Sequence, residues 1–185
     1  MFGKRAVLVG LTTSALVAGA AVGVAVGGGN ALATPASGFT PVTLAKGTFG
    51  EIFSHVHTKV PQFWNEVMKT VGATDLFVQD NTWDPSKCGS PGCIPSTGWH
   101  THPGPSFVIV TKGSVTVYDG DDPACTPHVF TANTPNNAFI DPGGGHVHII
   151  RDESGAVAKT VAVQFIPAGA DRRIDVTPAP GNCPF

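Results

Sequence analysis

The sequence predicts an all-β domain built from short strands. Glycine (23) and proline (16) together make up about a fifth of the 185 residues, a content typical of chains with many tight turns and few long helices. Segments rich in β-branched and aromatic residues recur roughly every eight to twelve residues, with turn residues between them, as in a sandwich or barrel. Charged residues make up only 13% and hydrophobic residues 42%, which excludes a disordered charged tail.

The expected elements run in order along one domain. Strands are expected at 42–46, 50–60, 75–78, 107–111, 114–118, 128–131, 137–140, 146–151 and 157–166, with a barrel core over about 75–170. One short helix is predicted at 61–70, because Pro61 suits a first helical turn, apolar residues share one side and Gly72 suits a stop. Lys112-Gly113 is interpreted as a hairpin turn between two strands.

Residues 1–33 are predicted to be a secretory signal peptide. Ala6 to Gly29 carries no charge, and Ala31 and Ala33 fit the −3 and −1 positions of a cleavage site. The alternative is an uncleaved membrane anchor, but the glycine-rich second half of this stretch makes it only weakly apolar. Cleavage leaves residues 34–185 as a secreted, extracellular domain that does not contact the membrane.

The charge pattern excludes nucleic acid as a partner. The formal net charge is −2, and the basic residues form no cluster beyond the pairs Lys4-Arg5 and Arg172-Arg173. The chain also lacks the Gly-x-Ser-x-Gly pattern and the glycine-rich phosphate-binding loop. Serine hydrolase and nucleotide hydrolase activities therefore find no support.

Four cysteines remain after cleavage: Cys88, Cys93, Cys125 and Cys183. In an exported chain an even number most simply means two disulfides, for which three pairings exist. The turn-forming segment 88–93 can close on itself, which would leave Cys125 to pair with Cys183 and tie down the C-terminal tail. A cysteine-histidine metal site is the rival interpretation, but the spacing suits zinc poorly.

Six of the seven histidines form three His-x-His pairs, at 55/57, 100/102 and 146/148. Residues i and i+2 of a strand point to the same face, so each pair could present two imidazoles to one ion. The alternative is that these histidines bind no metal and are simply exposed or hydrogen-bonded residues of a strand. We favour that alternative for His55 and His57, and a structural role for His128.

The stretch from Gly98 to Gly113 resembles the first motif of the cupin family. That motif runs Gly, His-x-His, three or four residues, Glu, six residues and Gly. His100, His102 and the closing glycine fall in register, whereas Ser106 occupies the Glu position. Residues 142–152 are similar to the second motif, which runs Pro-x-Gly, two residues, His, three residues and Asn.

In the second motif His148 fits best, with Asp152 at the Asn position and one extra residue in the glycine run. His146 is the alternative ligand. The resemblance covers most of residues 40–185 and is to secreted single-domain cupins of actinobacteria, of the cupin 2 type. It places Cys88 and Cys93 in an insertion, which supports pairing these two with each other.

The resemblance implies a double-stranded β-helix, a small barrel with a divalent transition metal (iron, manganese, nickel or zinc) held inside by His100, His102 and His148. Ser106 is a poor metal ligand, so we expect a first shell of neutral histidines that leaves the full +2 charge of the ion and favours an anionic chelating substrate. Asp152 could orient a ligand, and Trp99, next to His100, could line the pocket mouth.

Two functions stay open at this point. The first is a metal-dependent dioxygenase acting on a small chelating organic molecule, and the second is a non-catalytic module that binds a metal or a small ligand. A disulfide-stapled barrel without a working site is the third, structural alternative. The expected partner is a small molecule, and a homodimer is a candidate assembly because cupin barrels often dimerise.

Overall fold

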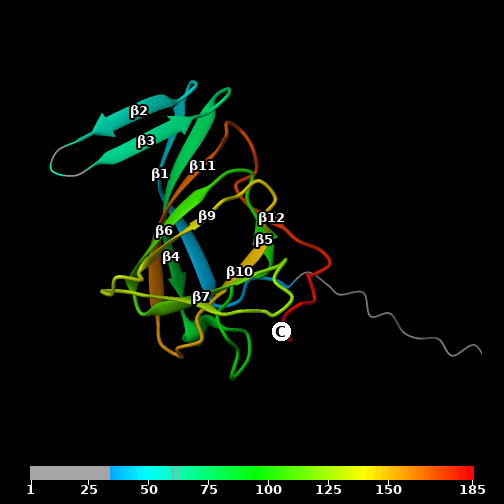
Figure 1. The fold of residues 1–185 in the computed structure, drawn as a ribbon. Coiled ribbons are helices and arrows are strands. Elements are labelled where there is room, and N and C mark those ends of the chain that lie inside the picture. Colours follow the sequence, from blue (N-terminus) through cyan, green and yellow to red (C-terminus); the bar gives the residue numbers. More distant parts are fainter. Residues whose placement is uncertain (1–33, 60, 62) are drawn as a thin grey trace, which may run out of the picture.

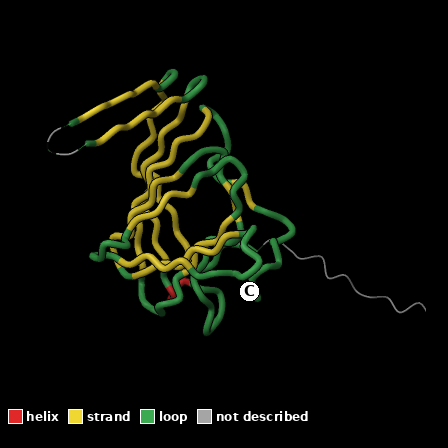
Figure 2. Tube along the Cα trace, in the orientation of Figure 1, coloured by secondary structure: helices red, strands yellow, loops and turns green. Residues whose placement is uncertain are grey.

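The computed structural model describes residues 34–59, 61 and 63–185; the predicted signal peptide lies outside this range. Its elements are β1 (Phe39–Phe49), β2 (Phe53–Thr58), β3 (Trp64–Lys69), β4 (Thr74–Trp83), the 3-10 turn η1 (Pro85–Lys87), β5 (His100–Thr101), β6 (Ser106–Lys112), β7 (Ser114–Asp119), β8 (His128–Thr131), β9 (Ala138–Asp141), β10 (His148–Arg151), β11 (Ala158–Pro167) and β12 (Ile174–Asp175). Strands and loops make up nearly all of the described chain (Figures 1 and 2), so the all-β prediction is confirmed.

Two five-stranded antiparallel sheets form the barrel. Their strand orders are β1-β4-β11-β6-β9 and β12-β5-β10-β7-β8. From β4 to β7, and again from β8 to β12, the chain passes from one sheet to the other with each successive strand. This alternation winds the chain around a common interior, as the predicted double-stranded β-helix requires. The two sheets face each other across the middle of the barrel (Figure 2).

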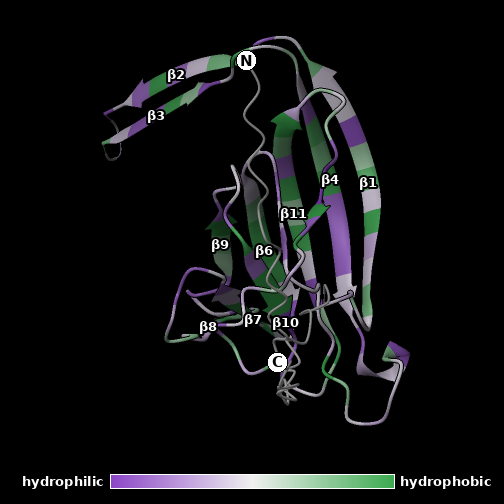
Figure 3. Cartoon of the chain, turned by 90° about the vertical axis from the view of Figure 1, so that its right-hand side faces the viewer, coloured by the Kyte–Doolittle hydropathy of each residue, from purple (hydrophilic) through white to green (hydrophobic). Residues whose placement is uncertain are grey.

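Strand alternation separates the interior of the barrel from its surface. On β6, Val108 and Val110 are buried, whereas Phe107 and Ile109 are 40% and 50% exposed. The two sets follow from the period of two along a strand, and this part of the prediction is confirmed. Hydrophilic and hydrophobic residues also alternate along β1, at the edge of the same sheet (Figure 3).

The apolar core lies in two clusters. The first packs inside the barrel and consists of Trp83, Val110, Val115, Val117, Ile150 and Ala158. The second lies on the other side of the sheet that contains β7 and β10, and consists of Trp99, Tyr118, Ile149 and Cys183. Neighbours Ile149 and Ile150 of β10 belong to different clusters, so both faces of this sheet are covered.

The predicted helix over 61–70 is wrong, because the segment forms β3. Its residues pair antiparallel with β2, from Thr58 opposite Trp64 to Phe53 opposite Lys69. Ten residues are too few to hold an isolated helix in water, whereas β2 offers a ladder of backbone hydrogen bonds. The resulting hairpin projects from the barrel (Figure 1).

Lys112-Gly113 forms a turn, but the strands that it joins do not pair with each other. β6 and β7 belong to different sheets, so this turn is a corner of the barrel and the predicted hairpin is wrong. Gly113 has a φ of +64°, and a Cβ on it would lie 3.0 Å from the carbonyl oxygen of Val157. Only glycine fits such a left-handed corner without strain.

Both disulfides have the pairing favoured from the sequence. Cys88 joins Cys93 and Cys125 joins Cys183, with Cα–Cα distances of 5.7 and 5.2 Å. Two disulfides are compatible with an extracellular protein. Among the described residues no helix is long and apolar enough to cross a membrane.

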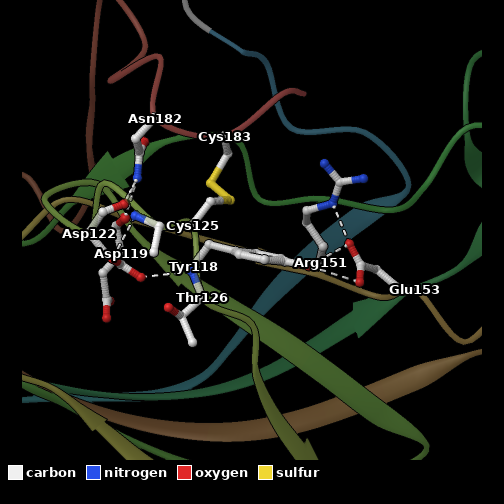
Figure 4. Close-up of a disulfide and its surroundings, with 10 residues drawn as sticks. Tyr118, Asp119, Asp122, Cys125, Thr126, Arg151, Glu153, Asn182 and Cys183 are labelled. Carbon is white, nitrogen blue, oxygen red and sulfur yellow. Dashed lines mark hydrogen bonds and ion pairs between the residues drawn. A yellow bond between two sulfur atoms is a disulfide. The ribbon is translucent and has the colours of Figure 1, made fainter.

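The second disulfide fastens the C-terminal tail to the barrel (Figure 4). Beside it, the Asn182 side-chain amide donates hydrogen bonds to the carbonyl oxygens of Asp119 and Asp122, at 2.8 and 2.6 Å. The ring of Phe185 lies under the guanidinium of Arg151, 3.6 Å from centroid to Cζ. The tail is therefore held by covalent, polar and cation–π contacts together.

Removing this disulfide by Cys125→Ala/Cys183→Ala should lower the free energy of unfolding by up to about 4 kcal/mol. The bond closes a loop of 58 residues, and the entropy lost by the unfolded chain grows with loop length. The matched control is Cys88→Ala/Cys93→Ala, whose five-residue separation predicts only about 2 kcal/mol. Urea unfolding compares the two, and an equal or larger loss in the control would contradict the loop-length argument.

Candidate metal centre

Three buried histidines meet inside the barrel. His148 at the start of β10 lies directly opposite His100 of β5, and His102 follows two residues later. One ring nitrogen from each of the three lies within 4.8 Å of the others, and the residues are only 1%, 3% and 8% exposed. The structure therefore brings together the three histidines that the cupin resemblance singled out.

Backbone carbonyls hold two of these rings in one tautomer. His100 Nδ1 lies 2.9 Å from the carbonyl oxygen of Gly98, and His102 Nδ1 lies 2.7 Å from that of Arg172. A carbonyl oxygen can only accept, so each Nδ1 donates its proton. In the neutral ring Nε2 then keeps a free lone pair, which is the usual arrangement of metal-ligating histidines.

Burial keeps the three rings neutral. Desolvation is the main cause that lowers the pKa of His102 to about 4 and that of His148 to about 3. The pKa of His100 is also lowered well below its ordinary value by burial, with the neighbouring His148 as the next cause. Near pH 7 all three imidazoles are unprotonated and can bind a cation.

A carboxylate that the sequence analysis missed lies beside the three histidines. Asp141, the last residue of β9, is 4% exposed and lies directly opposite Ser106 of β6. Its Oδ2 lies 3.6 Å from His102 Nε2, and its Oδ1 lies 3.6 Å from His148 Nδ1. The sequence analysis expected a ligand set of neutral histidines only; the structure adds a carboxylate beside them, on the strand that pairs with Ser106.

Asp141 brings atoms that can bind a metal close to one another. Oδ1 accepts a hydrogen bond of 3.1 Å from the backbone N–H of Gly143, but Oδ2 is buried without a hydrogen-bond partner among the described residues, as is His148 Nδ1. Oδ2 and the His102 Nε2 lone pair are both acceptors and repel at 3.6 Å. Two ligands bound to one ion at about 2.0–2.2 Å and a tetrahedral angle lie roughly 3.4 Å apart, so these groups fit a divalent cation.

His146 stands beside this cluster and not inside the cavity. Its Nδ1 lies 3.3 Å from Asp141 Oδ1, and its Nε2 lies 3.3 Å from Asp119 Oδ1. It could bind an ion with Asp141 and His148, since one ligand atom from each lies within 4.8 Å of the others. His148, and not His146, lines the cavity that holds His100 and His102.

Of the other predicted site residues, one lines the cavity and two do not. Ser106 lines the cavity, as expected. Trp99 does not, because strand alternation turns it away from His100 and packs it against Tyr118 in the second core cluster. Asp152 also lies elsewhere: its Oδ1 accepts from the backbone N–H and the hydroxyl of Ser154, and it lines a separate surface pocket.

The remaining histidines lie outside the cavity. His55 and His57 belong to the projecting β2–β3 hairpin, where His55 Nε2 lies 3.1 Å from Asn65 Oδ1. His128 lies 3.8 Å from Asp119 on the surface of β8. The hydrogen bond of His55 fits the role favoured for it from the sequence, and none of these three histidines lines the cavity.

The cavity next to the histidines is small and mixed in character. Its volume is about 60 Å³, room for a few water molecules. Its lining combines apolar residues (Phe39, Pro41, Trp83, Val108, Phe139, Ile150, Ala162), polar residues (Gln79, Asn81, Thr97, Ser106, Thr160, Gln164), the site residues and two arginines (Arg172, Arg173). The lining can therefore hold a small polar ligand beside the cluster.

Comparison with known proteins finds solved structures of similar fold, but no protein family or curated protein that matches. No family model matches the chain, and no curated protein matches it. Among solved structures, a cupin-like protein of Thermotoga maritima has 17% identity and a TM-score of 0.41, with 55% of this chain and 65% of that chain covered. A cupin superfamily protein of Desulfitobacterium hafniense has 8% identity and a TM-score of 0.38, with 68% and 81% covered.

An oxalate oxidase structure has 16% identity and a TM-score of 0.37, and the match covers 52% of this chain and 50% of that chain. At this level of similarity the matches assign no activity to this chain.

Proposed function

We propose that this protein binds a divalent transition metal through His100, His102, His148 and Asp141, inside a cupin-type barrel. The observation that supports this most directly is the pair of buried acceptors, His102 Nε2 and Asp141 Oδ2, 3.6 Å apart with no hydrogen bond to Oδ2 from the described residues. A cation between them turns a repulsive pair into an attractive one.

The donor set indicates which ions fit. Imidazole nitrogens suit zinc, copper, iron and nickel, and a carboxylate extends the range to manganese. Three neutral rings and one carboxylate reduce the charge of a divalent ion from +2 to +1. When bound, such an ion supplies Lewis acidity toward an oxygen-bearing ligand or dioxygen.

For the reaction class we propose a metal-dependent dioxygenase acting on a small chelating organic molecule. The chain's own residues support this by excluding bulk water from the histidines and by leaving a cavity of about 60 Å³ beside them. The non-catalytic alternative is a module that holds the metal or a small ligand without turnover. The two disulfides support an exported protein, and we propose that it works outside the cell.

Metal content tests the binding proposal. Protein secreted without a histidine tag should carry about one equivalent of a divalent metal by elemental analysis. His100→Ala, His102→Ala and His148→Ala should each lose most of it, because the remaining ligands compete poorly with water. The double variant His55→Ala/His57→Ala, on the hairpin, is the matched control and should keep it. Metal-free wild-type protein that takes up no ion would reject the proposal.

Oxygen uptake separates turnover from binding. The metal-loaded protein is mixed with a panel of small chelating acids, and dissolved oxygen is followed with an electrode. Uptake that requires both the metal and an acid supports the dioxygenase. Stable metal content with no uptake across the panel favours the binding module.

A further inference from the structure

Arg172 places an unpaired positive charge in the cavity beside the histidines. Of the three arginines among the described residues, Arg151 pairs with Glu153 and Arg173 pairs with Asp175. Arg172 lines the cavity and forms no ion pair with a carboxylate of the described residues. A guanidinium that is partly removed from water is stabilised by a nearby anion, so this position favours a negatively charged ligand.

One hydrogen bond holds this guanidinium in place. Arg172 Nη1 donates to Gln79 Oε1 at 2.6 Å, and Gln79 is itself buried and donates through Nε2 to Thr43 Oγ1 at 3.4 Å. A guanidinium carries five N–H donors in a planar fork that matches a carboxylate. The contact with Gln79 uses one of them and leaves the others for a ligand.

Two amide oxygens in the same cavity also lack partners. Asn81 Oδ1 and Gln164 Oε1 are buried with no hydrogen bond among the described residues, although Asn81 Nδ2 donates to Thr160 Oγ1 and Gln164 Nε2 donates to the carbonyl oxygen of Arg172. Each of these oxygens can accept a hydrogen bond from a ligand hydroxyl. The cavity therefore offers a binding group for an anion and acceptors for an O–H.

The charges agree with this chemistry. With a divalent ion held by Asp141 and three neutral histidines, the cluster and Arg172 together carry a net charge of +2. Little water is available to screen it, because the cavity holds only about 60 Å³. A small anion is the ligand that such a charge attracts.

We propose that the cavity binds a small hydroxy-carboxylate, with its carboxylate on the Arg172 guanidinium and its hydroxyl within reach of Asn81 and Gln164. This deepens the proposed function by naming the ligand class of the same site. The cavity volume restricts the ligand to a few non-hydrogen atoms, and glycolate is the simplest member of the class.

The role of the Arg172 side chain can be tested without disturbing the metal ligands. The Arg172 carbonyl oxygen, and not its side chain, accepts the hydrogen bond from His102 Nδ1. Arg172→Gln therefore removes the guanidinium and leaves the contact that orients His102. The exposed Lys112, which lines no part of the cavity, gives the control Lys112→Gln, with the same loss of one positive charge.

The experiment titrates glycolate into metal-loaded wild type, Arg172→Gln, Arg172→Lys and Lys112→Gln by calorimetry, with metal content measured in each sample. We expect saturable binding to wild type and Lys112→Gln, a Kd raised at least tenfold in Arg172→Gln, and an intermediate value for Arg172→Lys, with equal metal content in all four. Neutral acetamide should not bind.

Two results would overturn the proposal: no saturable glycolate binding to wild type, or a Kd for Arg172→Gln within twofold of wild type at equal metal content. If wild type retains no metal, the proposed function fails separately. The same titration on metal-free protein then still tests Arg172, because its guanidinium carries its charge without the ion. Binding there that requires Arg172 supports the proposal, and its absence overturns it.

Discussion

Asp141→Asn is expected to lower the affinity for a divalent metal by about 100-fold or more while the barrel stays folded. Even groups that only orient metal ligands contribute roughly 10–100-fold to affinity, and asparagine replaces a charged ligand by a neutral one of the same shape. The amide oxygen of the variant can still accept the hydrogen bond that Gly143 now gives to Oδ1. Competition with a metallochromic chelator measures the affinity.

The metal-free form should respond in the opposite direction. Asp141 Oδ2 is buried without a hydrogen bond from the described residues and lies 3.6 Å from another acceptor, His102 Nε2. Substituting asparagine removes this repulsion, since its N–H₂ can donate to Nε2. The free energy of unfolding without metal should therefore stay equal or rise, a combination that general damage to the fold cannot produce.

A swap across the strand pair is the sharpest control. Ser106 and Asp141 are directly opposite each other on β6 and β9, and Ser106 occupies the Glu position of the first motif. The double variant Ser106→Glu/Asp141→Ser moves the carboxylate back to that position and should recover most of the lost affinity. If Asp141→Asn alone keeps wild-type affinity, the ion is held by neutral histidines only, as the sequence analysis expected.

The strands were predictable because their signal is local. The alternation on β6 and the turn residues between strands place most elements within a few residues of their observed bounds. The hairpin β2–β3 was missed because the apolar spacing of residues 61–70 fits a helix equally well. Only pairing with Phe53–Thr58, a contact outside the segment, decides for a strand.

The site residues show the same difference between local patterns and contacts between distant segments. His100, His102 and His148 follow from motif spacing, whereas Asp141 becomes visible only through the pairing of β6 with β9, which no local pattern contains. One signal was available: a carboxylate stands directly before Pro142, where the second motif begins. Trp99 was misplaced although strand alternation alone turns it away from the face that carries His100.

The metal-free protein should lose stability steeply between pH 6.5 and about 4.5. His102 and His148 have pKa values of about 4 and about 3 in the folded protein, against about 6.5 in an unfolded chain. Below pH 6.5 these histidines therefore bind protons in the unfolded state but not in the folded state, and the free energy of unfolding falls as the pH falls. Each of these histidines contributes about 1.4 kcal/mol per pH unit in that window, and His100 acts in the same direction.

Urea unfolding of chelator-treated protein at several pH values between 7.5 and 4.5 measures this slope. Aspartates with lowered pKa values, such as Asp75 and Asp122, titrate below this window, so the slope reports the histidines. His148→Gln should reduce it by about 1.4 kcal/mol per pH unit, whereas His55→Gln/His57→Gln, on the exposed hairpin, should leave it unchanged. A flat profile in wild type would mean that the three rings accept protons in the folded state, and so are not the dry, neutral ligand set that the barrel presents to a cation.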